Sequence, residues 1–338
     1  MTHPIVFITH GPKALDNYYG ERALSALHAQ AEVRRGDSDA EWSSESLAEA
    51  ARGCQIIVSD RRVSCDELLL TRLPNLLAFL RCAVDVRNID LEAASAHGVL
   101  VTQASAGFMT SVSEWIVGVM LDLSRRISAA TAAYHAGITP APSMGRELRH
   151  ATLGIIGYGQ IGKTLADLGL AFGMRVVVTD PYAEVSKPDL HKLTLPELLV
   201  QADYVVCLAA ATPQTENLMN AAAFATMKPS AYFVNAARGN LVDEAALLQA
   251  LDSGQLAGCA LDVGRGPDQM PSPELARHRR VIATPHIGGL TPAAIEHQSL
   301  ETVQQVADIL QGRIPHGALN AAAAKRLQQW ARDHRGAS

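Results

Sequence analysis

Short apolar runs rich in Val, Ile and Leu recur along the chain and alternate with segments of helical periodicity. In the N-terminal third these runs occupy positions 5–9, 56–59, 76–81 and 99–102. Such runs, bounded by turn residues, are typical of strands that are buried on both faces, and their alternation with helices predicts a parallel sheet. The first part of the chain therefore predicts a small α/β domain.

The same alternation returns after a long helix, predicted over 113–127, and a segment without clear periodicity at 129–149. We expect this segment to be an arm that packs on a second subunit. A final helix is predicted over 292–310, and the polar tail 321–338 is expected to be weakly ordered. Further strands are predicted at 153–156, 175–179, 204–208, 232–235, 258–263 and 281–283. A chain of 338 residues fits two such domains.

A glycine-rich turn joins the strand at 153–156 to a helical pattern. It reads Gly157-Tyr158-Gly159-Gln160-Ile161-Gly162. Gly157 permits a tight turn, Gly159 lets backbone N–H groups approach a pyrophosphate, and Gly162 lets helix and strand pack closely. The first helical turn, with Gln160 and Ile161, offers unpaired N–H donors and a positive dipole end to the phosphates. The turn predicts a dinucleotide-binding unit.

An acidic residue ends the next predicted strand. Asp180 lies 18 residues after Gly162, where a carboxylate would bond both ribose hydroxyls and repel a 2′-phosphate. The cofactor is therefore predicted to be NAD and not NADP. Tyr182 either packs on the adenosine or is an ordinary surface residue.

The composition is that of a globular protein and argues against several kinds of partner. Hydrophobic residues make up 48% of the chain and charged residues 19%, which allows a large core. The net charge of −5, without a long basic block, argues against nucleic acid or an anionic membrane as partner. The five cysteines show no CxxC spacing and no His/Cys cluster, so we expect buried thiols, a reducing compartment and no bound metal. With no membrane-spanning apolar run and no signal-peptide pattern, we expect a cytoplasmic protein.

Several motifs follow the glycine turn in a fixed order. They are Thr212-Pro213, Asn235-Ala236-Ala237-Arg238-Gly239, the run LVDEAAL from Leu241, Ala260-Leu261-Asp262-Val263, and Thr284-Pro285-His286-Ile287-Gly288-Gly289. With these motifs the chain resembles the NAD-dependent D-isomer-specific 2-hydroxyacid dehydrogenases over most of its length. The resemblance implies an α/β fold of two doubly wound parallel-sheet domains: a Rossmann-type NAD domain (104–290) inserted in a flavodoxin-like substrate domain (1–103 and 291–338). It also implies a small-molecule acid as substrate and a homodimer.

The motifs supply groups that suit hydride transfer between a nicotinamide and a keto acid. Arg238, at a predicted strand end, presents a planar fork that can bind a carboxylate and polarise a carbonyl oxygen. His286, beside a glycine pair, can donate the proton in keto reduction and accept it in the reverse direction. Asp262 is expected to contact the nicotinamide carboxamide or ribose, with a turn or capping role as the alternative. The residues expected to contact the cofactor in these motifs are Thr212, Ala236, Arg238, Asp262, His286 and Gly288.

One position departs from the family pattern where a catalytic carboxylate is expected. The family usually has a glutamate five residues after the aspartate of the Ala-Leu-Asp-Val motif, and this glutamate raises the pKa of the imidazole. Here that position is Pro267. Without a carboxylate, His286 should titrate near the ordinary value of about 6.5, so keto reduction should fall off at a lower pH. We predict that Asp268 takes this catalytic role, and Glu274 is the other candidate.

The predicted substrate loop departs as well. Family members typically read R-x-G-x-G-x-D-N-I-D, whereas this chain reads RCAVDVRNID from Arg81 to Asp90. Ala83, Val84 and Asp85 thus stand where glycine N–H groups would hold a substrate carboxylate. We expect Asp85 to pair with Arg87 or Arg61, because a bare carboxylate would repel an acidic substrate. Arg61 would also favour a substrate with a second anionic group.

Ligands of open parallel sheets bind at the carboxyl ends of the strands, where His10, Arg61, Arg81, Arg238 and His286 are all expected. These residues predict an oxidoreductase that transfers a hydride between NAD(H) and a small D-2-hydroxy acid or 2-keto acid. Two alternatives stay open. The altered loop and the missing glutamate suit a non-catalytic NAD-binding sensor or scaffold, although such a protein would need neither Arg238 nor His286. The same changes permit a dehydrogenase of an atypical small acid.

Overall fold

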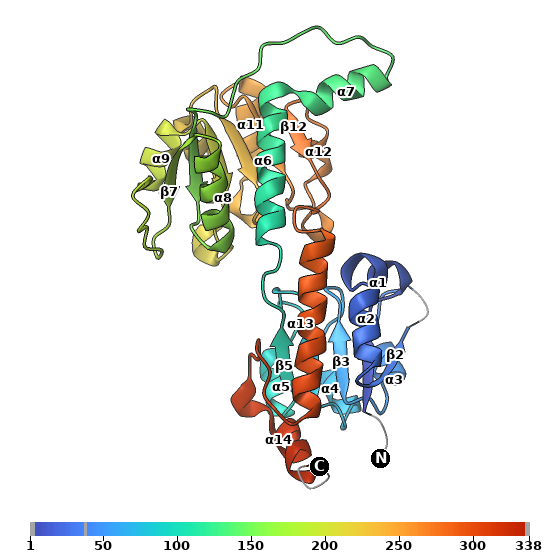
Figure 1. Cartoon of the computed structure of the whole chain (residues 1–338). Helices are drawn as coiled ribbons and strands as arrows, with labels where there is room; N and C mark the ends of the chain where they lie inside the picture. The colour runs from blue at the N-terminus through green and yellow to red at the C-terminus, as the bar shows by residue number, and fades with distance from the viewer. Residues whose placement is uncertain (1–3, 37–38, 335–338) are drawn as a thin grey trace. The chain divides into compact units, whose positions relative to one another are not determined.

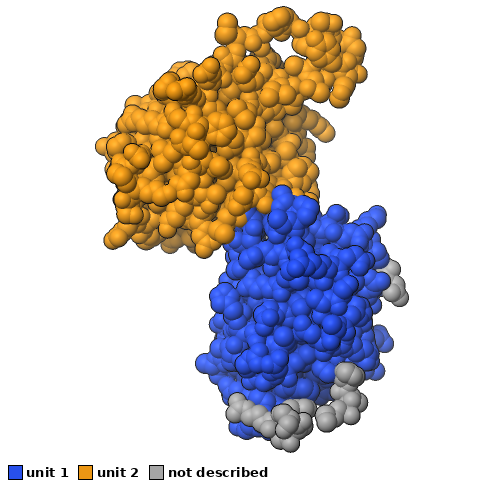
Figure 2. Space-filling model, viewed as in Figure 1, with its two compact units in different colours: residues 1–108, 291–338 blue, residues 109–290 orange. Residues whose placement is uncertain are grey.

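The computed structural model describes residues 4–36 and 39–334, without the side chains of Asp268 and His334, and the chain divides into two compact units (Figure 2). Unit 1 comprises residues 1–108 and 291–338, and unit 2 comprises residues 109–290. The chain therefore enters unit 2 between Phe108 and Met109 and leaves it between Leu290 and Thr291.

The first crossing lies beyond the expected boundary at 103/104, because hydrogen bonds hold the next residues on unit 1. The N–H of Ala104 donates to the carbonyl oxygens of Arg81 and Ala83, at 3.0 and 3.1 Å. The carboxylate of Glu301 accepts from the N–H and the hydroxyl of Ser105, both at 2.7 Å. The chain thus stays on unit 1 after its last strand ends.

Unit 1 is built on a five-stranded parallel sheet with the order β2-β1-β3-β4-β5 (Figure 1). This order is flavodoxin-like, so the fold predicted for this domain is confirmed. Its strands are β1 (Ile5–Ile8), β2 (Glu32–Arg35), β3 (Ile56–Ser59), β4 (Ala78–Arg81) and β5 (Leu100–Gln103). Its helices are α1 (Pro12–Tyr18), α2 (Glu21–His28), α3 (Ser44–Ala50), α4 (Glu67–Arg72), α5 (Leu91–Ala96), α13 (Pro292–Leu310) and α14 (Lys325–His334), with the 3-10 turn η4 (Ala321–Ala323).

Helices cover both faces of this sheet, and a separate apolar cluster fills the space on each side. Val6 and Ile8 of β1 belong to the cluster shared with α1, α2 and α13, whereas Phe7 belongs to the cluster shared with α3, α4 and α5. Successive side chains of a strand point to opposite faces, which explains this division. A strand buried on both faces gives the continuous apolar runs seen in the sequence.

The expectation that the C-terminal tail is weakly ordered is wrong for its described part. Residues 325–334 form α14, in which the side chain of Leu327 is 1% exposed and packs in the same cluster as α2 and α13. Only a narrow apolar stripe of this helix, with Leu327 and Ala331, faces the core. The segment is therefore polar on average, and its composition did not indicate an ordered helix. Residues 335–338 lie outside the described part.

Unit 2 is built on a seven-stranded parallel sheet with the order β12-β11-β10-β9-β6-β7-β8. Its strands are β6 (Thr152–Ile156), β7 (Arg175–Thr179), β8 (Leu190–Lys192), β9 (Tyr204–Cys207), β10 (Tyr232–Asn235), β11 (Gly258–Leu261) and β12 (Val281–Ala283). Its helices are α6 (Met109–Arg125), α7 (Ile127–His135), α8 (Gln160–Ala171), α9 (Leu195–Gln201), α10 (Ala221–Thr226), α11 (Glu244–Ser253) and α12 (Pro273–Ala276), with the 3-10 turns η1 (Pro213–Thr215), η2 (Gly239–Leu241) and η3 (Pro267–Gln269). The chain builds outward from β6 through β7 to β8, then returns to β9, so the strand order reverses between β6 and β9.

The predicted irregular arm is helical in its first part, which corrects the sequence-based expectation. Arg126, with φ of 54°, ends α6, and the chain continues as α7 over Ile127–His135. None of the residues of α7 is buried. Alanine-rich sequence favours a helix without an amphipathic pattern, so periodicity did not reveal it. No helix in the described ranges has the length and apolar character needed to cross a membrane.

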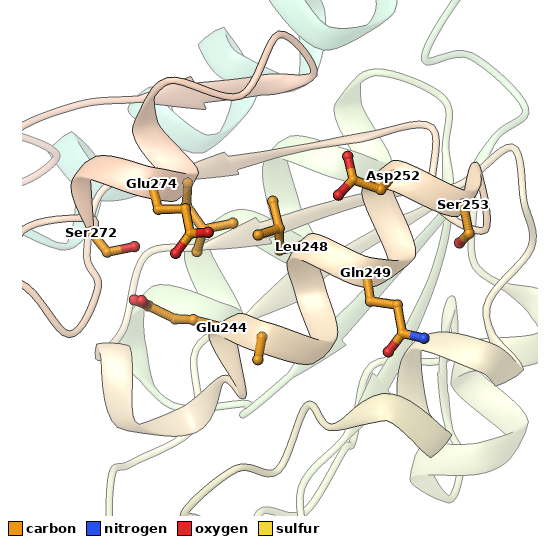
Figure 3. Close-up of a pocket in the computed structure, with 9 residues that line it drawn as sticks. Glu244, Leu248, Gln249, Asp252, Ser253, Ser272 and Glu274 are labelled. Atoms are coloured by element: carbon orange, nitrogen blue, oxygen red, sulfur yellow. The ribbon is translucent and has the colours of Figure 1, made fainter.

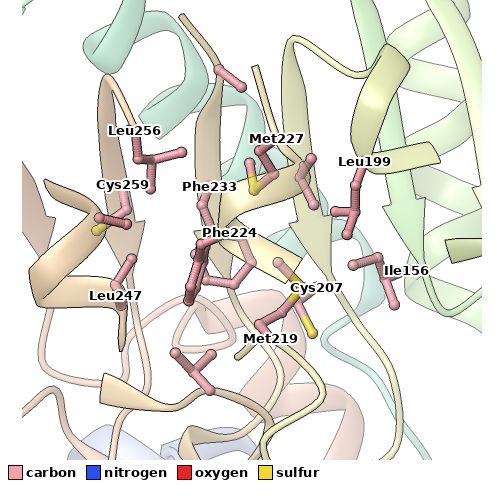
Figure 4. Close-up of a cluster of buried hydrophobic side chains, with 14 of the residues drawn as sticks. Ile156, Leu199, Cys207, Met219, Phe224, Met227, Phe233, Leu247, Leu256 and Cys259 are labelled. Carbon is pink, nitrogen blue, oxygen red and sulfur yellow. The ribbon is translucent and has the colours of Figure 1, made fainter. Parts of the chain in front are cut away.

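The main core of unit 2 lies between the sheet and helices α9, α10 and α11 (Figure 4). Phe224 of α10 meets Phe233 of β10 edge to face, with ring centroids 5.5 Å apart and an interplanar angle of 85°. Cys207 and Cys259 are buried in the same cluster. All five cysteines of the chain are free and buried, which confirms the prediction of buried thiols.

We expect Phe233→Ala to destabilise unit 2 by about 3–5 kcal/mol, because the substitution leaves a cavity in a fully buried cluster. The free energy of unfolding from urea titration measures this effect. The matched control is Phe172→Ala, since Phe172 is 42% exposed and should change the free energy of unfolding little. Equal effects of the two substitutions would contradict this account of the core.

Candidate active site

Neighbouring strands of unit 2 end at one edge of the sheet, and the predicted site residues follow these ends. Parallel strands place all their carboxyl ends at the same edge, and ligands bind there, near the point where the strand order reverses. The glycine turn follows β6, Asp180 follows β7, Thr212 follows β9, Arg238 follows β10, Asp262 follows β11 and His286 follows β12.

The surrounding chain requires glycine at some positions of the turn but not at all three. Gly157 has φ of 98°, and a Cβ there would lie 2.6 Å from the carbonyl of Leu208. A Cβ on Gly162 would overlap the carbonyl oxygen of Gly157, so close contact between α8 and the turn requires this glycine. Gly159 has φ of −75°, and a Cβ there would meet nothing within 4 Å. The packing of the chain therefore does not require glycine at position 159, and the space beside it is open to a ligand.

The N-terminus of α8 has the properties of a phosphate-binding end. Gly159 is the N-cap residue of this twelve-residue helix, and no side chain caps the free N–H groups. Gly159 and Gln160 are exposed and Ile161 is half-buried, so the first N–H groups are open to a ligand. Uncapped donors and the helix dipole favour an anion at this position. The residues present thus fit the pyrophosphate of a dinucleotide.

Asp180 is held as an ionised group at the end of β7. Its carboxylate accepts hydrogen bonds from the N–H groups of Tyr158, Tyr182 and Ala183, at 2.8, 2.8 and 2.9 Å. Burial raises the pKa of this carboxyl, but the three backbone donors and the charge of Lys192 outweigh burial, so the pKa is lowered. Because the pKa is lowered on folding, the resulting stabilisation is complete above about pH 4 and is lost only below it. The ring of Tyr182 is 95% exposed.

The carboxylate of Asp262, 3% exposed, organises the loop that carries His286. Its Oδ1 accepts from the hydroxyl of Thr284 (2.6 Å) and the N–H of Ile287 (2.8 Å), and its Oδ2 accepts from the N–H of Gly288 (2.7 Å). A Cβ on Gly288 would lie 2.8 Å from Oδ2, so only glycine permits this approach. Asp262 therefore fixes both sides of His286. Its expected contact with nicotinamide stays a prediction.

His286 has an unusual backbone conformation. Its φ of 57° lies in the left-handed region, which a non-glycine residue adopts only when its surroundings hold it there. The bonds from Asp262 to the neighbouring residues, and the bond from the His286 N–H to the carbonyl of Thr284 (3.0 Å), provide that restraint. Such restrained conformations are concentrated at functional sites.

The turn that carries Arg238 is fastened by Asn235, the last residue of β10. The amide of Asn235, which is 1% exposed, accepts from the N–H of Ala237 at 3.1 Å and donates to the carbonyl of Arg238 at 3.0 Å. The guanidinium of Arg238 donates to the carbonyl of Ala237 at 2.7 Å. Gly239 lies so close to Gly264 that a Cβ would overlap it. The sequence motif identified Arg238 but did not reveal that Asn235 and Thr284 hold the neighbouring loops in position. The available signal was a polar residue at or beside the end of a strand.

The loop that replaces the expected glutamate is a tight turn. Pro267 begins η3, and the N–H groups of Gly264 and Gly266 donate to the carbonyls of Gln269 and Met270, at 2.8 and 2.9 Å. Asp268 lies within η3, and its side chain is outside the described part of the structure. Its proposed role beside His286 therefore stays a prediction.

Glu274, the other carboxylate considered, lines a groove of about 580 Å³ between α11 and α12 (Figure 3). The other lining residues of this groove that Figure 3 labels are Glu244, Leu248, Gln249, Asp252, Ser253 and Ser272. Neither Arg238 nor His286 lines this groove. Its carboxylates would also repel an acidic substrate, so we do not assign the substrate to it.

The substrate-loop residues of unit 1 follow β4, and Arg61 follows β3. Arg87 donates to both carboxylate oxygens of Asp85, from Nε to Oδ1 at 3.0 Å and from Nη2 to Oδ2 at 2.6 Å, which confirms one of the two pairings predicted for Asp85. Arg61 lies over the ring of Tyr18, 5.7 Å from its centroid, and is exposed. Ala83 and Val84 are half-buried beside Asp85.

The fold and this edge define a class of protein: a two-unit α/β protein whose second unit has the glycine turn of a dinucleotide-binding unit. It carries an arginine and a histidine at the ends of β10 and β12, the two strands on either side of β11. Residues 117–288 match the family described as D-isomer specific 2-hydroxyacid dehydrogenase, NAD binding domain. The chain belongs to this family. NAD is therefore its cofactor, as predicted.

Relatives and solved structures agree with this assignment. The chain is 34% identical over 303 residues to D-3-phosphoglycerate dehydrogenase of Mycobacterium tuberculosis, which covers 88% of this chain and 56% of that protein. It is 36% identical over 288 residues to the Homo sapiens protein of the same name, with 83% and 53% covered. A solved structure of a Thermus thermophilus protein aligns with a TM-score of 0.83 at 30% identity, over 93% of this chain and 99% of the other. The chain spans about half the length of the curated relatives it matches.

We expect Gly159→Val to weaken NADH binding by roughly tenfold or more while leaving stability almost unchanged, since the new side chain meets only the phosphate-binding space. Fluorescence titration with NADH and thermal unfolding without NADH measure the two quantities. Gly162→Ala is the matched contrast, because its Cβ meets backbone and should lower the melting temperature without any ligand. Unchanged NADH affinity of Gly159→Val would contradict the assignment.

Proposed function

We propose that this protein is an NAD-dependent oxidoreductase that interconverts a small D-2-hydroxy acid and the corresponding 2-keto acid. The proposal rests on three residues that follow the adjacent strands β10, β11 and β12. Arg238 and His286 follow the two outer strands of this group, and Asp262, which follows the middle strand, restrains the histidine loop. A restrained histidine and a planar cation on the dinucleotide-binding edge suit proton transfer to a carbonyl oxygen.

Each side chain has a role that follows from its chemistry. Arg238 binds the carboxylate of the substrate and polarises the carbonyl oxygen next to it. His286 gives a proton to that oxygen during reduction and takes it back during oxidation. Bound NADH supplies the hydride that goes to the carbonyl carbon, which balances the reaction. Asp262 and Asn235 position these two groups and do not themselves exchange protons with the substrate.

The proposed cofactor contacts extend along the same edge. The glycine turn and the first residues of α8 bind the pyrophosphate, and Asp180 binds the adenosine ribose. The remaining proposed contacts are Thr212, Ala236, Arg238, Asp262, His286 and Gly288. Thr212, which pairs with Thr215 in the exposed turn η1, is proposed to lie on the adenine side.

The proposed substrate contacts of unit 1 are Arg61, Ala83, Val84 and Asp85. The Asp85–Arg87 pair supports this proposal, because it balances the carboxylate that would otherwise repel an acid. The curated relatives are D-3-phosphoglycerate dehydrogenases, so a phosphorylated hydroxy acid is one candidate substrate. Exposed Arg61 would suit such a second anionic group.

We also propose that the protein is a cytoplasmic homodimer. The segment after α6 exposes Ile127 (55%), Tyr134 (62%), Ile138 (62%) and Met144 (101%), an apolar surface that a second copy would cover. Free, buried cysteines agree with a reducing compartment.

We expect His286→Asn to lower kcat for keto-acid reduction by roughly 100-fold or more, because the proton donor is lost, whereas loss of one among several cofactor contacts should change NADH affinity far less. Stopped-flow reduction of a panel of 2-keto acids, with NADH titration alongside, measures both. His191→Asn, at an exposed position of β8, is the matched control. Tight NADH binding by the wild-type protein without turnover of any acid would instead favour the sensor alternative.

We expect Asp268→Ala to move the pH at which keto reduction declines to a lower value, toward the histidine reference of about 6.5. A neighbouring carboxylate favours the protonated imidazole, so its loss lowers the histidine pKa, and reduction needs that proton. The pH dependence of kcat/KM for wild type and variant measures this shift. Glu274→Ala is the matched control, and superimposable profiles for Asp268→Ala and wild type would rule out the role of Asp268.

A further inference from the structure

One arginine of unit 2, Arg265, bonds together the loops that follow three neighbouring strands. It lies in the loop after β11, and its partners lie in the loops after β9 and β10. Its Nη2 donates to the carboxylate of Glu216 at 2.7 Å and to the amide oxygen of Asn217 at 2.6 Å. These two residues follow η1 in the β9 loop. Arg265 therefore links segments that are far apart in the sequence.

The same guanidinium bonds the end of the 3-10 turn η2, which begins at Arg238. Arg238 is the N-cap residue of η2, and Val242 is its C-cap residue. Nη2 of Arg265 donates to the carbonyl of Asn240 at 3.0 Å, and Nε donates to the carbonyl of Val242 at 3.1 Å. The last carbonyls of a helical turn lack a partner inside the turn, so an arginine that bonds them acts as a C-terminal cap. Asn235 thus holds the start of η2, and Arg265 holds its end.

Backbone contacts place the β11 loop directly against η2. A Cβ on Gly239 of η2 would lie 2.1 Å from the carbonyl carbon and oxygen of Gly264, so the two segments touch. The N–H of the next residue, Arg265, donates to the carboxylate of Glu244 at 2.9 Å. The base of the arginine is therefore fixed as well as its guanidinium.

Four oxygen atoms converge on the guanidinium of Arg265: one of a carboxylate, one of an amide side chain and two of backbone carbonyls. Without a donor these oxygens would face one another and lose hydrogen bonds. The bond from Arg265 is the main influence that lowers the pKa of the Glu216 carboxyl, so this carboxylate is ionised at neutral pH. Lysine would not replace the arrangement, because it lacks a planar fork that donates from two nitrogen atoms.

We propose that Arg265 is a positioning residue that fixes the turn carrying Arg238 and thereby sets how the substrate is bound. Arg238 is proposed to bind the substrate carboxylate and to polarise the adjacent carbonyl oxygen, and both tasks need a guanidinium held in one direction. Arg265 acts through η2 and does not itself bind the substrate. The effect on the substrate rests on the proposed function, whereas the fastening of the turn does not.

Arg265→Met tests the fastening, because it keeps an apolar stem and removes every donor of the side chain. Hydrogen exchange followed by mass spectrometry measures the turn directly. We expect the peptide that covers 236–243 to exchange roughly tenfold faster, since the turn opens more often when its carbonyls lose their donor. The peptide that covers the glycine turn, 157–165, should exchange at the wild-type rate.

Arg280→Met is the matched control. Arg280 is half-buried and also donates to a backbone carbonyl, that of Leu251 at 2.9 Å, but it precedes β12 and so lies at the opposite edge of the sheet. Its loss should leave the exchange of 236–243 at the wild-type rate. Arg265→Lys is a milder change that should still speed exchange of this peptide, so it keeps the test decisive if Arg265→Met does not fold.

Ligand binding tests the effect on the substrate. The probe is oxamate, which has the carboxylate and the adjacent carbonyl oxygen of a 2-keto acid, titrated into the NADH-saturated full chain. We expect Arg265→Met to weaken oxamate binding and to lower kcat/KM for keto acids by roughly tenfold, while NADH affinity changes by less than about twofold. In an Arg238→Lys background the same substitution should have a much smaller effect on oxamate, because a residue that acts through Arg238 then has little left to position.

Unchanged exchange of 236–243 in Arg265→Met would overturn the proposal. So would wild-type oxamate affinity in that variant, or an equal loss of affinity in the wild-type and Arg238→Lys backgrounds. Faster exchange throughout unit 2, with NADH affinity reduced in proportion, would show a general structural role and would also overturn it. If the wild-type protein neither turns over an acid nor binds oxamate, the proposed function fails, and hydrogen exchange still decides whether Arg265 holds the turn.

Discussion

The parallel pairing of β6, β9, β10, β11 and β12 is the constraint on which the candidate active site depends. These strands all pair in parallel, so each of them ends at the same edge of the sheet. Residues separated by more than a hundred positions, such as Gly159 and His286, are thereby carried to one side of one sheet. The crossover helices that make this possible also bury both sheet faces, which accounts for the apolar strands.

Hydrogen bonds from two buried side chains then hold the loops that carry the reactive groups at the strand ends. Asp262 binds three groups of the His286 loop, and Asn235 binds both sides of the turn that carries Arg238. Both side chains are nearly fully buried, so their bonds face little competition from water. The left-handed backbone of His286 is a consequence of this restraint. Asp262 is thus already engaged by the protein, and its contribution to the site begins with the geometry of the loop.

Much of the fold and of the candidate site could be predicted from the sequence, and the features that were not predicted were missed for physical reasons. Most strands of both sheets, though not the short β8, have local patterns that predict them, as do the glycine turn, Asp180 and helix α13 at Pro292–Leu310. Helices α7 and α14 escaped prediction, because one is alanine-rich without an apolar face and the other has only a narrow one. The expected boundary at 103/104 lies before the crossing between Phe108 and Met109, because Ser105 donates hydrogen bonds to Glu301, far along the chain, and these hold it on unit 1.

The sequence by itself determined the family and the cofactor, and it nominated the residues with reactive side chains, since those depend on local motifs whose spacing has a direct chemical reason. It could not show which groups a carboxylate binds or which polar atoms have no partner. The pairing of Asp85 with Arg87 was one of two options until the loop was placed. The buried, unpartnered atoms of His10 and Ser59 become visible only in the folded chain, because burial is a property of the whole packing and not of any segment. The tertiary structure therefore decided which of the polar groups at the strand ends are bonded by the protein itself and which are not.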